Sequence, residues 1–333
     1  MGLSPRAGAG VTVRPFVRAA ALALLAAAAR PATVQAQDIH FLVVAGVGGD
    51  EEHVTQFHQW SVAALDAAKK QGVLDANVTY LGERVETSGG RMKARATRDN
   101  VSKAFTDIAA RAKPDDQLFV LLIGHGSFDG RGAAFNLPGP DLSAADYGLL
   151  LDRFRTQRIA FVNTASSSGG FLEPLGGPAR TIVTATRTGG ERNETRFPQF
   201  FVEALGAEAA DRDRNGRVSV QEAFDYAAAK VKAAYEQAGQ ILTEHATIDD
   251  GSGGTLAATL YLAPERSRAA SAQNVDPALR ALLEQRDALE RRVNDLRLRK
   301  DRMPAAEYDE QLEALLTELA LKTRAIRDAE TNK

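Results

Sequence analysis

The sequence contains no cysteine and few aromatic residues, and these shortages exclude several classes of function. Without cysteine, the chain forms no disulfides, offers no thiolate to a metal and has no cysteine nucleophile. Aromatic residues make up only 6% of the chain, which leaves little material for stacking nucleic-acid bases. Lys and Arg number 41 against 43 Asp and Glu, so no strongly basic surface is expected either. We therefore expect no nucleic-acid partner.

The first 36 residues have the pattern of a secretory signal peptide. Arginines precede a short apolar run at 19–29, and a small-residue exit, Val34-Gln35-Ala36, follows it. The run is too short to span a bilayer stably, and no second candidate lies downstream. Residues 1–36 carry four Arg and no acid, so their removal changes the net charge from −2 to −2 − 4 = −6. We predict an exported, soluble protein, periplasmic or secreted, with no stable membrane span after signal removal; a buried Ala-rich helix is the alternative.

Residues 37–262 alternate between apolar runs and amphipathic stretches. Strands are predicted at 40–45, 77–81, 117–123, 158–163 and 180–184, and helices at 55–71, 97–111, 143–156, 198–210 and 221–237. This alternation indicates an α/β fold, in which a mainly parallel sheet lies between two layers of helices. Residues 255–262 form either a last strand or a short apolar connection.

The composition changes from residue 263 to an Ala-, Leu-, Arg- and Glu-rich segment that ends at residue 333. Leu282, Leu289, Leu296 and Met303 recur every seven residues, and Pro304 then ends the helical pattern. Leu312, Leu315, Leu319 and Ile326 continue the pattern in a second helix. This predicts an α-helical hairpin that resembles a coiled coil. It either packs on its own domain or contacts a second copy or a partner protein through residues 264–333.

The first predicted strand ends in a glycine-rich loop that superficially matches a dinucleotide-binding motif. Gly46 and Gly48 have the right spacing, but Glu51 stands where the third glycine belongs. The neighbouring acidic residues would also repel a pyrophosphate. We therefore expect no organic cofactor.

Two predicted strands end in loops that are able to carry chemistry. The strand at 117–123 continues into Gly124-His125-Gly126-Ser127, and the strand at 158–163 into a serine-rich turn at 164–171. Carboxyl ends of neighbouring parallel strands meet at one edge of a sheet, so we expect the two loops to lie close together. A histidine between glycines suits a general base beside an oxyanion-stabilising N–H, or a turn histidine bonded to backbone. The remaining histidines lie in no such context: His40, His53, His58 and His245.

This arrangement resembles the legumain-like members of the caspase–legumain clan of cysteine peptidases. Those enzymes have a strand that ends in His-Gly-Ser and another that ends in Ala-Cys-x-Ser-Gly. This chain has His125-Gly126-Ser127 and Ala165-Ser166-Ser167-Ser168-Gly169. The resemblance covers residues 38–262 and implies a caspase-like three-layer α/β sandwich. It also implies that His125 is the catalytic histidine, that Gly126 donates its N–H to the oxyanion, and that Ser166 replaces the catalytic cysteine.

Further positions depart from the family pattern or follow it loosely. In legumains, an Asn after the first strand orients the histidine, and an Arg before a nearby His contributes to the specificity pocket. Gly48 and Glu52 stand at these two positions, so the asparaginyl preference does not carry over. The loop after the fifth strand borders the substrate pocket in the family. This implies pocket roles for Arg187 and Glu191, and a solvated charged loop is the alternative.

The replacement of cysteine by Ser166 favours a pseudopeptidase. A thiol is partly ionised at neutral pH, whereas a serine hydroxyl needs an aligned base, so the expected loss is about 4–6 kcal/mol of barrier. We therefore predict an exported peptidase homologue that binds a peptide or protein ligand. One alternative is an active hydrolase with Ser166 as nucleophile and His125 as base, and another is an assembly protein that acts through its helical hairpin. A loosened Gly-x-Ser-x-Gly elbow would instead use Ser167 with His245.

Residues 211–222 match the calcium loop of an EF-hand at each diagnostic position, with Gly216 at the sharp turn. The candidate ligands are the side chains of Asp211, Asp213, Asn215, Ser219 and Glu222 and the carbonyl of Arg217. A predicted helix precedes the loop and another follows it, as the motif requires. Three arginines in the loop reduce its attraction for a dication. The motif therefore predicts a weak Ca²⁺ site, with a purely structural turn as the alternative.

Overall fold

The computed structural model describes residues 1–2, 37–251, 256–263, 277–297 and 303–331. The predicted signal segment falls almost entirely outside these residues. The chain divides into two units, residues 1–35 and 36–333, and all the helices and strands described belong to the second unit. Of the helices described, none is long and apolar enough to cross a membrane.

A seven-stranded sheet forms the centre of residues 37–262, in the order β10-β9-β8-β4-β1-β2-β3. Neighbouring strands pair in parallel except β10, which runs antiparallel to β9 at one edge. The strands are β1 (Ile39–Ala45), β2 (Val78–Gly82), β3 (Ala94–Arg95), β4 (Gln117–Ile123), β8 (Arg158–Asn163), β9 (Arg180–Thr184) and β10 (Thr247–Asp250). This confirms the predicted α/β class with its mainly parallel sheet.

Strands β1 and β4 are buried on both faces, which explains their nearly continuous apolar sequences. Successive side chains alternate between the two sides of the sheet. Phe41 and Val43 belong to the core on one side, whereas Leu42 and Val44 belong to the core on the other. The sheet therefore separates two hydrophobic cores.

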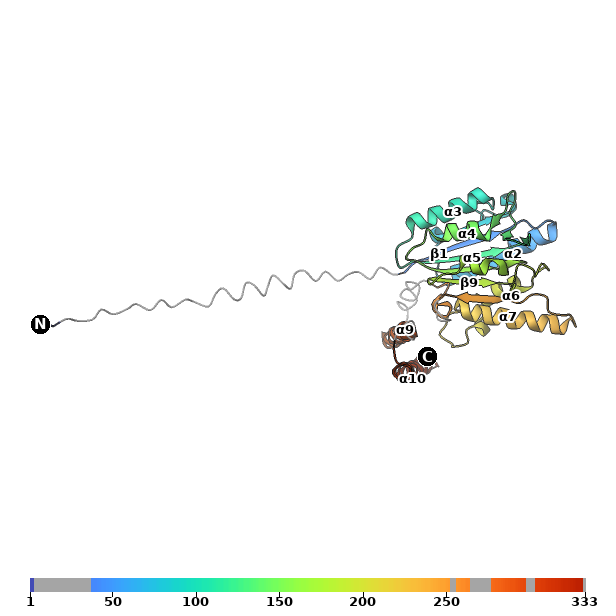
Figure 1. Ribbon diagram of the computed structural model, residues 1–333. Helices are drawn as coiled ribbons and strands as arrows, with labels where there is room; N and C mark the ends of the chain where they lie inside the picture. Colours follow the sequence, from blue (N-terminus) through green and yellow to red (C-terminus); the bar gives the residue numbers. More distant parts are fainter. Residues whose placement is uncertain (3–36, 252–255, 264–276, 298–302, 332–333) are drawn as a thin grey trace. The chain divides into compact units, whose positions relative to one another are not determined.

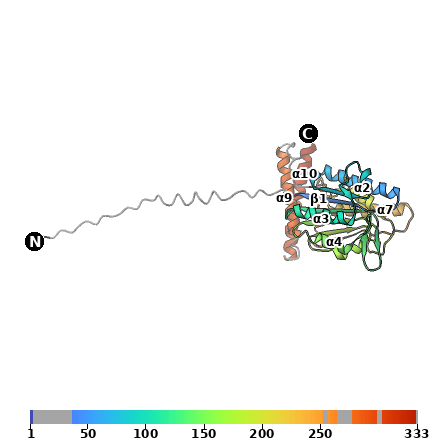
Figure 2. The same cartoon turned by 90° about the horizontal axis from the view of Figure 1, so that it is seen from above.

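Helices cover both faces of the sheet and complete three layers (Figures 1 and 2). On one side are α2 (Glu51–Lys70), α6 (Phe197–Ala204) and α7 (Val220–Gln237). On the other are α3 (Arg98–Arg111), α4 (Ala144–Leu151) and α5 (Leu172–Leu175). Figure 2 shows α2 and α4 on opposite sides of β1.

The boundaries of two helices differ from the predictions. Helix α2 begins at Glu51 rather than at residue 55, because the Asp50 side chain accepts a hydrogen bond from the His53 N–H and caps the helix. Helix α4 ends at Leu151, well before the predicted residue 156.

Several short elements were not predicted. A small antiparallel sheet consists of β5 (Gly126–Phe128), β6 (Ala133–Phe135) and β7 (Leu142–Ser143). The last strand of the main sheet is the polar, half-buried β10, and not residues 255–262. The described part of 255–262 contains a 3-10 helix at Ala257–Thr259 and one bridge between Ser219 and Tyr261. These residues are therefore a connection, the other alternative that the sequence left open.

The C-terminal segment forms a helical hairpin of α9 (Pro277–Arg297) and α10 (Ala305–Thr331). The seven-residue pattern supplies its interface, because Leu289, Leu296 and Leu315 lie in one buried cluster. Val293 and Tyr308 complete that cluster. Pro304 immediately precedes α10, where its fixed backbone angle is compatible with a helix start.

Phe161→Ala should lower the free energy of unfolding by about 3–5 kcal/mol. The Phe161 side chain on β8 is fully buried, and its ring lies 5.4 Å from that of Tyr147 and 6.3 Å from that of Phe171. Leu149→Ala is the matched control, since Leu149 on α4 is 69% exposed, and it should change stability by less than about 0.5 kcal/mol. Urea denaturation of both variants measures the difference, and equal effects would contradict this description of the core.

Candidate functional site

Three loops meet at the carboxyl edge of the sheet, where β1, β4 and β8 end. The Gly46 N–H after β1 donates to the Ile123 carbonyl at 2.9 Å, and the Thr164 N–H after β8 donates to the Leu122 carbonyl at 3.1 Å. Both acceptors belong to β4. These bonds hold the glycine loop, the histidine loop and the serine loop side by side.

His125 is half-buried at the end of β4, and its ring is fixed by three neighbours. Its Nε2 lies 3.2 Å from the Gly48 carbonyl oxygen. Its ring centroid lies 4.9 Å from that of His53 and 5.1 Å from that of Phe57. A carbonyl only accepts, so Nε2 carries the hydrogen, and Nδ1 is the basic nitrogen of the neutral ring. Gly48 thus orients His125 through its backbone.

His53 belongs to this site although its sequence context gave no reason to single it out. Its Nδ1 lies 2.8 Å from Asp50 Oδ2, and its Nε2 lies 3.2 Å from Glu194 Oε1. The hydrogen bond with Asp50 raises the pKa of His53, and Glu194 adds to this increase. The sequence contained one local signal for this role of His53, namely Asp50 three residues before it. Glu194 is 141 positions away, and only the fold brings it near.

Ser166 is 6% exposed and bonded to Gly126 on both of its hydrogen-bonding sides. Its Oγ accepts from the Gly126 N–H at 3.2 Å and donates to the Gly126 carbonyl at 3.1 Å. In the part of the chain that the structure describes, no hydrogen bond joins Ser166 to His125. The structure therefore brings Ser166 and Gly126 together and places His125 one residue away. The N–H assigned to the oxyanion is bonded to the serine hydroxyl instead.

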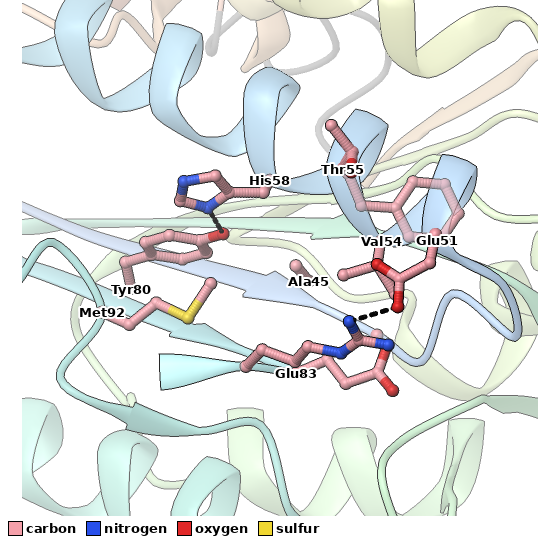
Figure 3. Close-up of a pocket in the computed structure, with 11 residues that line it drawn as sticks. Ala45, Glu51, Val54, Thr55, His58, Tyr80, Glu83 and Met92 are labelled. Carbon is pink, nitrogen blue, oxygen red and sulfur yellow. Dashed lines mark hydrogen bonds and ion pairs between the residues drawn. The ribbon is translucent and has the colours of Figure 1, made fainter. Parts of the chain in front are cut away.

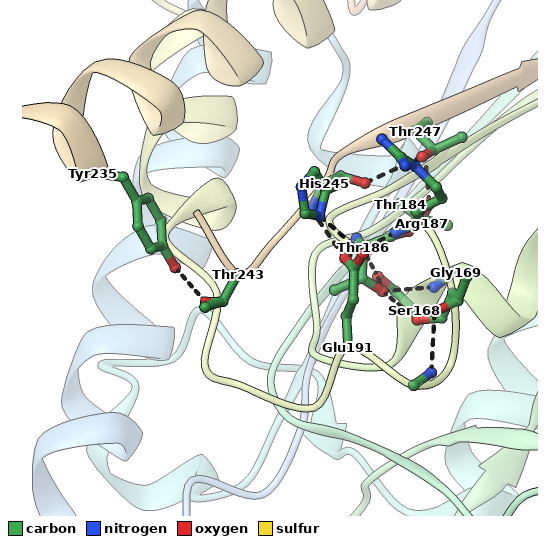
Figure 4. A network of polar contacts seen from close by, with 12 residues as sticks. Ser168, Gly169, Thr184, Thr186, Arg187, Glu191, Tyr235, Thr243, His245 and Thr247 are labelled. Carbon is green, nitrogen blue, oxygen red and sulfur yellow. Dashed lines mark hydrogen bonds and ion pairs between the residues drawn. The ribbon is translucent and has the colours of Figure 1, made fainter. Parts of the chain in front are cut away.

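A buried polar network joins the ends of β8 and β9 (Figure 4). Ser168 Oγ accepts from the Ala185 N–H at 3.1 Å and from the Thr186 N–H at 3.2 Å. The Gly169 N–H donates to Thr186 Oγ1 at 2.8 Å. A side chain on Gly169 would come within 2.2 Å of the Arg187 backbone carbon, so only glycine fits. The Ser-Ser-Gly sequence after β8 thus serves to attach this turn to β9.

The alternative nucleophile, Ser167, is poorly placed for attack. Its residue is 1% exposed, and its Oγ has no hydrogen-bond partner among the described residues. Its backbone is left-handed, with φ 57°. His245, the base that this alternative requires, is bonded through Nδ1 to Glu191 Oε1 at 2.9 Å. Both residues are bonded to Glu191, since the Ser167 N–H donates to the Glu191 carbonyl at 2.8 Å, but among the described residues no hydrogen bond joins Ser167 Oγ to His245.

The four residues assigned to the substrate pocket lie in different surroundings. Gly48 contacts the His125 ring through its carbonyl oxygen. Glu191 connects two segments, because its Oε2 accepts from the Arg187 N–H at 3.1 Å and from the His245 N–H at 3.0 Å. The Arg187 side chain is exposed, and Glu52 is exposed on the first turn of α2.

The acidic side chains of the 211–222 loop converge. Ligand oxygens of Asp211, Asp213 and Glu222 all lie within 4.8 Å of one another. Burial raises the pKa of Asp213 to about 6, and the charge of Glu222 adds to this effect. Glu222 also helps to cap α7, since its Oε2 accepts from the N–H of the N-cap residue Ser219 at 2.9 Å and from the Ser219 hydroxyl at 2.8 Å. Mutually repelling carboxylates are the electrostatic setting that a dication stabilises.

The rest of the loop supports the same turn. Gly216 has φ +82°, and its N–H donates to Asp211 Oδ2 at 2.7 Å. Asn215 Oδ1 accepts from the Arg217 N–H at 2.9 Å. The Arg217 guanidinium lies over the Tyr261 ring, 3.8 Å from its centroid.

The helix predicted at 198–210 before this loop is broken in two. Helix α6 ends at Ala204, and a separate 3-10 helix covers Glu208–Ala210. Gly206 lies in the break, where its low helix propensity favours termination. The helix predicted after the loop is present as α7.

Comparisons with known proteins give limited information. No protein-family model and no curated protein matches the chain. Among solved structures, the chain is similar to the crystal structure of the Drosophila initiator caspase Dronc, with a TM-score of 0.40 and 9% sequence identity. That similarity covers 64% of this chain and 80% of the caspase chain. A similarity of this size says nothing about activity, which depends on the residues of the site.

Gly126→Ala should destabilise the protein by about 1–3 kcal/mol, because the added Cβ overpacks the site. A Cβ at Gly126 would lie 2.2 Å from the Ser166 carbonyl oxygen, a backbone atom that cannot rotate away. Gly132→Ala is the control, since its Cβ would meet no atom within 4 Å. Thermal melting of both variants tests the prediction, which fails if the two lose equal stability.

Proposed function

We propose that this chain is a legumain-like pseudopeptidase, which binds a peptide or protein segment at the ends of β1, β4 and β8 without hydrolysing it. The observation that carries this proposal is the bonding of the Ser166 hydroxyl to both the N–H and the carbonyl of Gly126. That arrangement leaves two requirements of acyl transfer unmet.

The first requirement is a base in contact with the nucleophile. Serine is a weak nucleophile unless a base accepts its proton. In this site the proton of Ser166 is donated to the Gly126 carbonyl, which is not a base. His125 has a basic Nδ1, yet within the described chain it makes no hydrogen bond to Ser166.

The second requirement is a free donor for the developing oxyanion. Removal of one such donor typically costs about 10²–10³ in rate. The Gly126 N–H already donates to Ser166 Oγ. Substrate would have to displace this bond, with no proton acceptor in place.

The ligand-binding part of the proposal is supported by the groups around His125. Two half-buried imidazoles, His53 and His125, lie side by side where β1 and β4 end. The carboxylates of Asp50 and Glu194 flank His53. Half-buried polar and aromatic groups at the carboxyl ends of parallel strands are typical of binding sites. Export of the protein remains part of the proposal. So do contacts of the helical hairpin with a second copy or a partner, because Leu321 on α10 is an apolar side chain that is 63% exposed.

The wild-type protein should not be labelled at Ser166 by a fluorophosphonate and should not cleave a peptide library. Ser166→Cys should gain weak, iodoacetamide-sensitive cleavage, because a thiolate needs less assistance from a base. Ser127→Cys, at an exposed position of the histidine loop, is the control and should gain none. Wild-type cleavage that Ser166→Ala abolishes would instead identify an active serine hydrolase.

We also propose that residues 211–222 bind Ca²⁺ weakly, through the residues predicted from the motif. The convergence of Asp211, Asp213 and Glu222 supports this, together with the left-handed turn at Gly216. Calcium would neutralise the repulsion among the carboxylates and connect the segment before the loop to α7. The loop arginines favour the affinity range of extracellular modules, with Kd ~10⁻⁴–10⁻³ M.

Calcium at ten times its Kd should add about 1.4 kcal/mol of stability, which raises the melting temperature by a few degrees. Glu222→Gln should abolish the increase, whereas Glu208→Gln, exposed before the loop, should retain it. Because Glu222 also caps α7, the measurement is the calcium-induced shift in each variant and not its absolute melting temperature. Magnesium should have less effect. No shift in chelator-treated wild-type protein at about 10 mM calcium would show that the loop is only a turn.

A further inference from the structure

A cavity of about 220 Å³ lies beside the site, between α2 and the ends of β1 and β2 (Figure 3). Sites for whole drug-sized ligands are usually larger, at about 300–1,000 Å³. The cavity is therefore suited to a single long side chain.

The cavity and His125 share part of their surroundings. Phe57 lines the cavity, and its ring contacts the His125 ring at 5.1 Å. Glu83 also lines the cavity, and its Oε2 accepts from the Gly48 N–H at 2.9 Å. The carbonyl of the same glycine binds His125 Nε2. A peptide lying along the histidine and serine loops would therefore pass next to this cavity.

The inner end of the cavity is uncharged. His58 Nδ1 lies 3.0 Å from the Tyr80 hydroxyl, and the two rings are stacked. Burial lowers the pKa of His58 and raises the pKa of Tyr80 to about 12, so both are neutral at pH 7. Figure 3 shows this pair and Met92 at one end of the cavity, with Glu51 and Glu83 at the other. Val54 and Phe57 add apolar surface.

The mouth of the cavity has an unbalanced negative charge. It carries the carboxylates of Glu51 and Glu83 and the guanidinium of Arg84, which sum to −1. Arg84 is paired with Glu51 at 2.5 Å. The hydrogen bond with Glu51 raises the pKa of Arg84, and the charge of the half-buried Glu83 adds to this increase, so one guanidinium serves both carboxylates. Two carboxylates that share one cation are stabilised further when a ligand supplies a second cation.

We infer that this cavity is a subsite for a lysine or arginine side chain of a bound peptide. The aliphatic stem lies against Val54 and Phe57, and the cationic end reaches Glu83. Long basic side chains bury their stems while they keep their charged ends near polar groups. An acidic side chain would be repelled, and a neutral one would leave the net charge of −1 uncompensated. The inference rests on the proposed function, since it names the chemistry of the peptide that the site binds.

The test uses fluorescein-labelled hexapeptide pools, whose binding to the full-length protein is measured by fluorescence anisotropy. One central position is fixed as Lys, Arg, norleucine or Glu, and the other positions exclude charged residues. The Lys and Arg pools should bind about tenfold more tightly than the norleucine pool, and the Glu pool most weakly. Glu83→Gln, which keeps the size of the side chain and an acceptor for the Gly48 N–H, should remove this preference. Glu86→Gln, exposed three residues later and outside the cavity lining, should preserve it.

A second variant tests the cavity without any change of charge. Thr55 is exposed at the rim, so Thr55→Trp should obstruct the cavity and weaken binding of the Lys and norleucine pools alike. Equal binding of the Lys and norleucine pools to the wild-type protein would overturn the inference and leave peptide binding intact. A Lys preference that survives in Glu83→Gln would also overturn it. If no pool binds, the proposed function fails and the inference fails with it.

Discussion

The close backbone contact between Gly126 and Ser166 is the constraint on which the arrangement of the three loops depends. A Cβ at Gly126 would lie 2.2 Å from the Ser166 carbonyl oxygen, so the two loops approach to a distance that only glycine permits. The same glycine begins β5 and pairs with Phe135 of β6. The position of His125, one residue earlier, follows from this contact. The His125 ring then reaches the Gly48 carbonyl and so connects the glycine loop to the other two loops.

This packing also explains how the proposed loss of catalysis would be compatible with a well-formed site. A serine at position 166 forms two hydrogen bonds with Gly126 and leaves no buried hydroxyl unsatisfied. The hydroxyl therefore stabilises the junction of the loops. In the proposed pseudopeptidase, this residue would be a structural replacement for a nucleophile that holds the loops around His125 in place.

Much of the fold could be predicted from the sequence, because its central strands are apolar on both faces. The sequences IHFLVVA and QLFVLLI leave little alternative to strands buried between two layers. The edge strand β10 has the sequence TIDD, whose polar residues carry no such signal. Its position depends on pairing with β9, a contact between residues far apart in the chain. The short strands β3 and β7 have two residues each, too few for any periodicity.

Part of the site could also be predicted from the apolar central strands. His125 and Ser166 follow strong strands, so the topology of a parallel sheet places them near each other. Glu83 lacks a local signal and His53 has only Asp50, because their other partners, Gly48 and Glu194, come from other elements. Sequence patterns identify residues at strand ends better than residues that a distant segment completes.

The hydrogen bonds of Glu222 affect how the 211–222 loop would respond to a metal. One of its carboxylate oxygens caps α7 through Ser219, and the other accepts from the backbone N–H groups of Arg212 at 2.9 Å and Asp213 at 3.3 Å. An ion that engaged both oxygens would compete with four existing hydrogen bonds, counting the Ser219 hydroxyl. Binding would then be an exchange of partners, in which the ion takes over the organisation of the loop from the protein's own donors. The loop would keep its shape in either state, so metal occupancy would change its rigidity more than its fold.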